Sequence, residues 1–475
     1  MDGNVDGQTR LEKDSLGELA VPLEAYYGVQ TTRAIANFPI SGLRLPTAFI
    51  HTHALLKRAA AQVNLELGLL DEKLYQAITQ AALEVEQGQF DDQFPIDIYQ
   101  TGSGTSTNMN VNEVIASRAN EILGGKRGDK KPVHPNDHVN MGQSSNDTIP
   151  TSLYVSALVA IEKELRPALR VLEASLRAKS QELWGVIKTG RTHLQDATPI
   201  RMGQEFLGYA GQIERAQYRL DDTRRELSEV ALGGTAVGTG VNMTPGFAAQ
   251  VLAKMSEWLG LELRESDNHF QSQNTLDGAV HTSGALRTIA VSIMKIANDI
   301  RWMASGPRAG INELIVPAVQ PGSSIMPGKV NPVIAESATM VAAQVMGFDV
   351  TIGIAGQSGN FELNVMMPLV AYNLMQSIQL LAHTVTNLAK QCVDGIVATE
   401  QGPNMLEQGL LLATPLAPVI GYDKTAALVK KALATGRTIR ELSYESSGLS
   451  KEEVDRLLDP ASMTEPGAST GSSGG

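Results

Sequence analysis

Four short polar segments interrupt an otherwise apolar, helix-forming sequence, and their residue types suit the binding of a small anion and acid–base chemistry upon it. They are residues 101–110 (TGSGTSTNMN), 143–150 (QSSNDTIP), 190–196 (GRTHLQD) and 322–332 (GSSIMPGKVNP). Hydroxyl and backbone N–H groups hold anions, and a histidine can exchange protons near neutral pH. The four segments together define a candidate site.

The first two segments carry no net basic charge of their own. Residues 101–110 offer hydroxyls and backbone N–H groups suited to an anion, although a plain turn explains them equally well. A phosphate loop is disfavoured because the Gly-Lys-Ser/Thr ending is missing. Residues 143–150 stand directly before a long helix, with Asn146, Asp147 or Thr148 as the expected N-cap and Pro150 in the first turn. A helix N-terminus also attracts carboxylates, so capping and binding are compatible.

The last two segments bring the reactive side chains. His193 stands beside Arg191 and Thr192 at a break between two helical patterns. A lone histidine is usually structural, and this setting favours a catalytic role. Proline, glycine and serine break helical structure between Pro317 and Pro332. Loops on rigid scaffolds tend to carry binding and catalysis, and a long connection between helices is the alternative.

Long helices must position these segments. Over residues 203–231 apolar side chains recur alternately three and four apart, which predicts a bundle helix with a coiled-coil-like seam. Further helices are expected over 153–183, kinked at Pro167, over 276–303, buried almost all round, and over 365–389. Two more fall between 47 and 89. Helices of about 30 residues span roughly 45 Å, so they form a rod whose several apolar faces pack against partner subunits.

The fold class expected is mainly α: an elongated central helical bundle with smaller N- and C-terminal domains, assembling into a multi-helix oligomeric core. A chain of 475 residues exceeds the size of one compact domain. We predict an N-terminal domain over 1–144, a central long-helix bundle over 145–398, and a small C-terminal helical domain over 399–475. The first eight residues and 466–475 are expected to be flexible ends.

Composition narrows the class of protein. The net charge of −12 disfavours nucleic acid and anionic membrane as partners. The single cysteine, Cys392, excludes a disulfide framework, a thiolate zinc site and a cysteine-held iron–sulfur cluster. No run of about 18 uncharged apolar residues suggests a membrane span, and the first residues do not resemble a signal peptide. A cytoplasmic enzyme is the expectation.

Residues 322–332 resemble the signature loop of the aspartase/fumarase superfamily, and the other three segments resemble its substrate-site motifs in the same order. The similarity runs from about residue 10 to 467. Within the superfamily, Ser103 and Ser145 are similar to class II fumarases, since aspartases usually carry Ala and Thr there. His134, Pro135, Asn136 and Asp137 look like the fumarases' secondary dicarboxylate site. Residues 25–31 (AYYGVQT) instead resemble an aspartase.

The resemblance implies reversible hydration of fumarate to L-malate, a step of the tricarboxylic acid cycle, through an aci-carboxylate intermediate. It implies no cofactor and no metal. Ser323 would be the general base, acting as an oxyanion stabilised by backbone N–H groups, with Ser324 as the alternative. Lys329 and Asn331 would stabilise the developing charge. His193 and Glu336 would form a charge-relay pair that activates water, although an acid at a helix N-terminus also explains Glu336.

The resemblance also implies which residues hold the small dicarboxylate substrate: Ser103, Gly104, Thr105, Ser144, Ser145, Asn146, Thr192, Ser324, Lys329, Val330 and Asn331. It implies a homotetramer in which three subunits share each active site. The bundle argument supports an oligomer without that number. Three other functions stay open: an aspartate ammonia-lyase, a non-catalytic structural helical protein, and a lyase for a larger succinyl adduct.

Overall fold

The computed structural model describes residues 8–466, and the chain divides into two compact units. Unit 1 comprises Met1–Pro167, Gln217–Ala290 and Ala343–Ala382; unit 2 comprises Ala168–Ala216, Val291–Ala342 and His383–Gly475. Apart from Gln8 and Pro466, the ends predicted to be flexible lie outside the described residues. The division falls inside long helices, and the three-domain boundaries stay a prediction.

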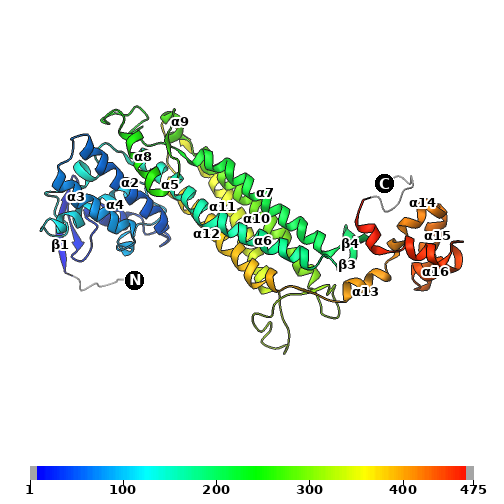
Figure 1. Ribbon diagram of the computed structural model, residues 1–475. Helices are drawn as coiled ribbons and strands as arrows, with labels where there is room; N and C mark the ends of the chain where they lie inside the picture. Colours follow the sequence, from blue (N-terminus) through cyan, green and yellow to red (C-terminus); the bar gives the residue numbers. More distant parts are fainter. Residues whose placement is uncertain (1–7, 467–475) are drawn as a thin grey trace. The chain divides into compact units, whose positions relative to one another are not determined.

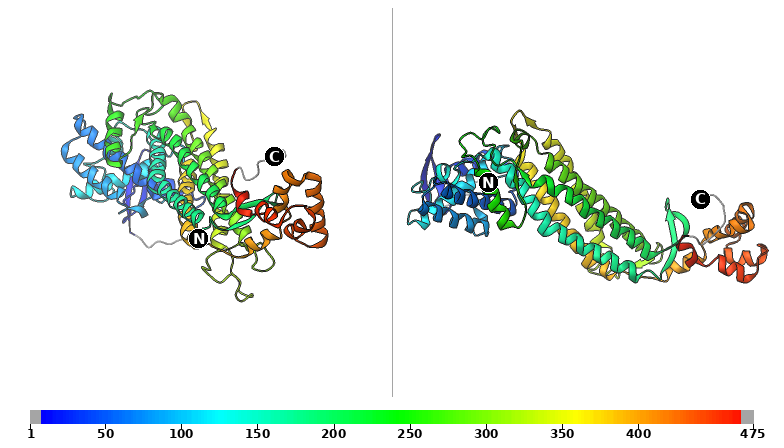
Figure 2. Two further views of the ribbon diagram at one scale, coloured as in Figure 1. Left: turned by 45° about the vertical axis from the view of Figure 1, so that its right-hand side comes forward. Right: turned by 45° about the horizontal axis from the view of Figure 1, so that its top comes forward.

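Long helices dominate both units, as the apolar spacing predicted. They are α5 (Ser145–Ala160), α6 (Arg166–Glu182), α7 (Met202–Leu227), α10 (Asp277–Met303), α11 (Val333–Gly356) and α12 (Met367–Gln391). The segments within each unit lie side by side (Figures 1 and 2). In unit 2 the Tyr209 hydroxyl of α7 donates to Asp299 of α10 at 3.0 Å, and in unit 1 the Ser283 hydroxyl of α10 donates to Asp349 of α11 at 2.8 Å. The mainly-α class is confirmed.

The helix predicted over 153–183 is built from three pieces. A single π-helical turn, η3 (Ile161–Leu165), separates α5 from α6, and the Arg166 N–H reaches back to the Ile161 carbonyl. Pro167 follows at once and has no N–H to donate, so the wider turn absorbs the break in the hydrogen-bond ladder. The predicted disturbance at Pro167 is therefore a local change of helix type.

The N-terminal part of unit 1 is a hairpin packed on helices. Its elements are β1 (Thr9–Asp14), β2 (Gly17–Pro22), α1 (Val29–Asn37), α2 (Thr47–Glu66), α3 (Glu72–Glu86), η1 (Asp91–Gln93), α4 (Thr105–Ile122) and η2 (Pro135–Val139). No side chain of α1 caps its N-terminus; the buried Glu113 of α4 accepts N–H groups from Gly28, Gln30 and Thr31 instead. A carboxylate is favoured there by the helix dipole. Residues 25–31 thus serve the packing of α1.

The rest of unit 1 consists of short elements beside the long helices: β5 (Glu229–Val230), α8 (Phe247–Leu259), β6 (Arg264–Glu265), α9 (His269–Asn274), β8 (Gly359–Asn360) and β9 (Leu363–Asn364). Strands β5 and β6 pair in parallel, while β8 and β9 pair antiparallel. These two-residue strand pairs hold the neighbouring loops in place, and they do not change the mainly-α class.

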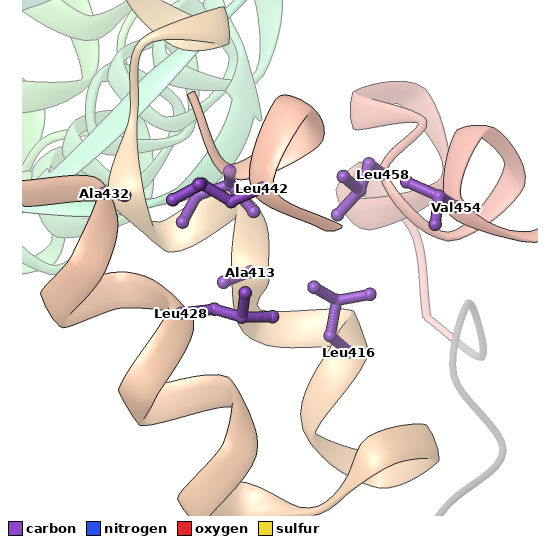
Figure 3. Close-up of a cluster of buried hydrophobic side chains, with 8 residues drawn as sticks. Ala413, Leu416, Leu428, Ala432, Leu442, Val454 and Leu458 are labelled. Atoms are coloured by element: carbon purple, nitrogen blue, oxygen red, sulfur yellow. The ribbon is translucent and has the colours of Figure 1, made fainter. Parts of the chain in front are cut away.

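Unit 2 joins its share of the long helices to a hairpin and a C-terminal helical group. The elements are β3 (Ile187–Thr192), β4 (Gln195–Arg201), β7 (Leu314–Ile315), η4 (Val393–Gly395), β10 (Val397–Ala398), α13 (Gln401–Glu407), η5 (Leu410–Leu416), α14 (Ala417–Ile420), α15 (Tyr422–Thr435), α16 (Ile439–Ser446), α17 (Lys451–Leu457) and η6 (Pro460–Thr464). Leu416, Leu428, Leu442 and Leu458 are buried together in one apolar cluster (Figure 3). The short C-terminal helices predicted after residue 399 are confirmed.

Candidate active site

Three hydroxyl side chains from two helix N-termini meet in unit 1. The Thr105 hydroxyl, at the start of α4, lies 2.8 Å from the Ser103 hydroxyl and 2.6 Å from the Ser145 hydroxyl at the start of α5. We call Ser103, Thr105 and Ser145 the hydroxyl cluster. Uncharged donors at two helix N-termini, with the positive ends of both dipoles behind them, have the chemistry needed to hold a carboxylate.

Glycines allow the chain to reach this position. Gly104 is the N-cap of α4 with a φ of 71°, and a Cβ there would lie 2.9 Å from Ile149. At Gly102 a Cβ would lie 1.6 Å from the Val365 carbonyl oxygen, and the Met367 N–H donates to the Gly102 carbonyl at 3.0 Å. The turn before α4 is therefore clamped against the start of α12 and requires both glycines.

The start of α5 corrects the predicted N-cap. Ser144 is the N-cap: its hydroxyl accepts from the Asn146 N–H, and the Asp147 side chain accepts from the Ser144 N–H at 2.9 Å. The predicted candidates Asn146, Asp147 and Thr148 lie inside the helix, and Asp147 is the reciprocal partner in a capping box. Capping thus fixes Ser144, and it places the Ser145 hydroxyl toward Thr105.

A glycine-rich segment that the sequence reasoning did not single out lies beside this turn. Asp147 also accepts N–H groups from Gly233 at 3.2 Å and from Thr235 at 3.0 Å, and the Asn146 amide donates to the Ala236 carbonyl at 2.8 Å. Thr235 has a φ of 52°, an unusual conformation for a threonine. The density of glycine over residues 233–240 (GGTAVGTG) was the available signal.

In unit 2, residues 316–332 form the loop between β7 and α11. The Gly322 N–H donates to the Lys329 carbonyl at 2.8 Å, and a Cβ at Gly322 would lie 2.5 Å from that oxygen. The Asn331 amide closes the same turn by donating to the Gly322 carbonyl at 2.7 Å. Lys329, Val330 and Ser324 are exposed. The base of the loop is tied, and its tip presents side chains outward.

The Ser323 hydroxyl is held by the loop backbone. Its Oγ accepts N–H groups from Ile325 at 3.2 Å and from Met326 at 3.0 Å. Two donors aimed at one oxygen stabilise negative charge on it and favour its deprotonated form. Within residues 8–466 the Ser324 hydroxyl accepts no such N–H group, so the geometry favours Ser323 over its neighbour as a base.

His193 lies at the tip of the β3–β4 hairpin, where the sequence suggested only a break between helices. Thr192 pairs with Gln195, which leaves His193 and Leu194 as the two turn residues, with φ of 57° and 59°. A two-residue turn with both φ positive normally contains Asn and Gly. Non-glycine residues held in that region cost about 1–3 kcal/mol each, and such strain clusters at functional sites.

Buried ion pairs brace the strand that carries His193. The carboxylate of Glu313, which is fully buried, lies 2.9 Å from Lys188 and 2.8 Å from Arg191. Lys188 also contacts Glu205 of α7 at 2.9 Å. These contacts fix β3 on both sides of Gly190, and they leave His193 exposed beyond the braced strand.

Glu336 lies in the first turn of α11, as an acid favoured by the helix dipole would. Within unit 2, as far as residues 8–466 describe it, no hydrogen bond or ion pair joins Glu336 to His193. The structure thus brings together Ser103, Thr105 and Ser145 in unit 1, and Gly322, Ser323 and Asn331 in unit 2. The relay pair is not assembled in the single chain.

The predicted secondary site lines a cavity of about 600 Å³ in unit 1. His134, Pro135 and Asn136 face it together with Gln30, Lys13, Arg33 and Lys130, whereas Asp137 is not among its lining residues. The Nδ1 atom of His134 accepts N–H groups from Asn136 and Asp137, and it lies 3.4 Å from the Asp137 carboxylate. Asp14 and Glu113 line the cavity as well, and Arg33 pairs with Asp14 at 2.8 Å, so Lys13 and Lys130 are the lining cations that could attract an anion.

Known proteins resemble this chain over nearly its whole length. The lyase family model matches residues 17–347, and the model of the fumarase C C-terminus matches residues 412–465. The class II fumarate hydratase of Thermosynechococcus vestitus is 51% identical over 451 residues, 95% of this chain and 97% of that protein. That of Xylella fastidiosa is 49% identical over 467 residues, 98% of both chains. A class II fumarase structure from Schistosoma mansoni has a TM-score of 0.94 and 39% identity, and covers 97% of this chain and 100% of that chain.

Proposed function

Because the chain belongs to the class II fumarate hydratases, we propose that it interconverts fumarate and L-malate as a carbon–oxygen hydro-lyase. A proton next to a carboxylate is very weakly acidic, and its removal places a second negative charge on that carboxylate. The site must therefore supply a base, donors for the developing aci-carboxylate, and a route for hydroxide to leave as water.

Ser323 is the base in this proposal. In the dehydration direction its oxyanion takes the proton from C3 of L-malate, and the electron pair moves into the adjacent carboxylate. The observation that carries the assignment is the pair of N–H groups from Ile325 and Met326 on its Oγ. A neutral serine is a poor base, and those donors lower the cost of the oxyanion. Lys329 and Asn331, on the same loop, would stabilise the aci-carboxylate.

The hydroxyl cluster would hold the substrate's carboxylates, with Gly104, Ser144 and Asn146 shaping the two helix starts. Thr192, Ser324 and Val330 would complete the binding surface. His193 and Glu336 would activate a water that shuttles a proton at C2, the carbon that gains hydroxide in hydration and releases it, protonated, as water in dehydration. We propose that these two residues come from different subunits.

An exposed apolar stripe on α11 supports an oligomer. Met340, Val350 and Ile354 are 67%, 62% and 55% exposed, and with Ala343 and Gly347 they recur three and four residues apart. By length and composition alone α11 could cross a membrane, but core helices pass the same test. A stripe at heptad spacing fits a partner helix, and we propose a homotetramer that shares its active sites. We also propose a cytoplasmic location, because a single cysteine, Cys392, leaves the chain without the disulfide framework common in secreted proteins.

Ultraviolet absorbance of fumarate tests the reaction. The purified chain should form fumarate from L-malate and should not form it from L-aspartate. Activity on aspartate alone would make the chain an ammonia-lyase. Activity on neither would favour a larger succinyl substrate or a structural role.

A further inference from the structure

A buried lysine lies behind the hydroxyl cluster, and the mechanism above does not use it. Lys57 of α2 is 0% exposed, as is His53 one turn earlier on the same helix. Burying an ammonium ion is costly unless its hydrogen bonds are satisfied, so a lysine in this position requires a physical reason.

Three neutral amide oxygens satisfy the Lys57 ammonium. Its Nζ donates to Asn108 Oδ1 at 2.7 Å, to Asn140 Oδ1 at 2.9 Å and to Gln143 Oε1 at 2.9 Å. An ammonium has three N–H donors and no acceptor, so these bonds use its full capacity. The three acceptors converge on one point, and they reach it from different segments of the chain.

The acceptors lie on the two segments that also carry the hydroxyl cluster, or directly before them. Asn108 lies on α4 one turn after Thr105, and Gln143 directly precedes Ser144 at the start of α5. The Asn108 amide also donates to Asn140 at 3.2 Å. Lys57 therefore links the start of α4 to the start of α5 through hydrogen bonds. These are the helix starts whose Thr105 and Ser145 hydroxyls lie 2.6 Å apart.

The charge of Lys57 also balances a buried carboxylate. Asp147 is fully buried, and burial raises its pKa, whereas the N–H groups of Ser144, Gly233 and Thr235 and the charge of Lys57 favour its ionised form. When ionised, it places a negative charge beside a site for dianions. Burial lowers the pKa of Lys57 to about 7, against the opposing charge of Asp147. His53, the other titratable neighbour, stays neutral because burial lowers its pKa to about 3.

We propose that Lys57 is a positioning residue for the dicarboxylate: it sets the spacing of the α4 and α5 starts, and its buried positive charge favours a dianion in the hydroxyl cluster. The inference rests on the proposed function and assigns a role to a side chain that touches neither the substrate nor the reacting atoms.

The test is Lys57→Met, with Lys254→Met as the matched control. Lys254 on α8 pairs with Glu66 at 2.8 Å and makes no contact with the hydroxyl cluster. We expect Lys57→Met to raise both the KM for L-malate and the inhibition constant of succinate about tenfold, which corresponds to ~1.4 kcal/mol. Loss of uniform binding leaves kcat within about threefold. The control should match the wild type.

A pH profile separates this role from simple structural support. Wild-type kcat/KM for L-malate should fall as the pH rises through about 7, because Lys57 loses its charge there. Lys57→Met should lack that component. A folded Lys57→Met enzyme with wild-type KM, succinate inhibition and pH profile would overturn the proposal.

If Lys57→Met does not fold, a second variant tests the positioning role of Lys57. Gln143→Met removes one acceptor and keeps the lysine; an increased KM and succinate inhibition constant would support the proposal, and unchanged values would overturn it. The wild-type protein is assayed first. A wild type inactive on both L-malate and fumarate refutes the proposed function, whereas an active wild type with unaffected variants refutes only the role of Lys57.

Discussion

The hydroxyl cluster and the 316–332 loop contribute to one proposed reaction from differently built backbone. In unit 1 the hydroxyls sit on the first turns of two helices, clamped by close glycine contacts, by the capping box of α5 and by the buried network around Lys57. In unit 2 the loop is tied at its base by Gly322 and Asn331, and residues 324–330 are exposed.

The hydroxyl cluster and the loop are built differently because they have different roles in the proposed reaction: one holds a carboxylate and the other removes a proton. Holding a carboxylate requires donors fixed before the substrate arrives, since ordering them afterwards would cost binding energy. Removing a proton requires a base that contacts the substrate and is then shielded from water, which suits a loop. Substitutions in the two regions should therefore alter different kinetic constants.

The largest effect is expected at the loop. Ser323→Ala should lower kcat by at least about 10³-fold, because it removes the base while the backbone donors stay in place. Initial rates of fumarate formation from L-malate measure this, with circular dichroism and native mass to show that fold and assembly are intact. Ser324→Ala is the matched control and should cost less than about tenfold in kcat. The reverse order would move the base to Ser324.

The relay pair tests whether the site is shared between chains. His193→Asn and Glu336→Gln should each lower kcat about 10²-fold, the usual contribution of one acid–base group. If the two residues come from different subunits, unfolding and refolding the two variants together should restore part of the activity in mixed oligomers. Mixtures no more active than either variant alone would place the pair within one chain or remove it from the mechanism.

The buried hydrogen-bond network around Lys57 and His53 should make the folding stability of unit 1 depend on pH in the acid range. Burial lowers the pKa of His53 to about 3, so the unfolded chain binds a proton below pH 6.5 that the folded chain does not. This contribution to stability is complete above pH 6.5 and is lost as the pH falls toward 3, at about 2 kcal/mol between pH 7 and 5. Thermal unfolding at the two pH values measures it. His53→Gln should flatten the dependence, and an unchanged dependence would assign it to other groups.

The smallest effect on activity is expected within the hydroxyl cluster. Thr105→Val keeps the side-chain shape and removes the hydroxyl that lies between Ser103 and Ser145. One lost hydrogen bond to a charged group is worth about 1.5–3 kcal/mol, so KM for L-malate should rise about tenfold or more. We expect kcat to change less than KM. A fall in kcat alone would mean that the cluster acts on the transition state and not on binding.

The sequence by itself determined the helices and the family. Apolar spacing placed α7, α10 and α12 to within a few residues, because heptad periodicity is a local property that burial of one face imposes. The 322–332 segment resembles the family's signature loop, and that resemblance pointed to Ser323, with Ser324 as the alternative. The cap at Ser144 was misplaced by two to four positions, since Asn, Asp and Ser all cap well and only the hydrogen bonds choose among them.

Only the tertiary structure decided how the polar segments are held. The hairpin turn at His193, the donors on the Ser323 hydroxyl and the clamp at Gly102 depend on backbone conformation and on distant partners. Lys57 lies in an apolar helical pattern that gives no sign of its three amide partners, which follow it by 51 to 86 positions. Side-chain periodicity reports which face is buried, whereas a buried hydrogen bond depends on which segments meet there.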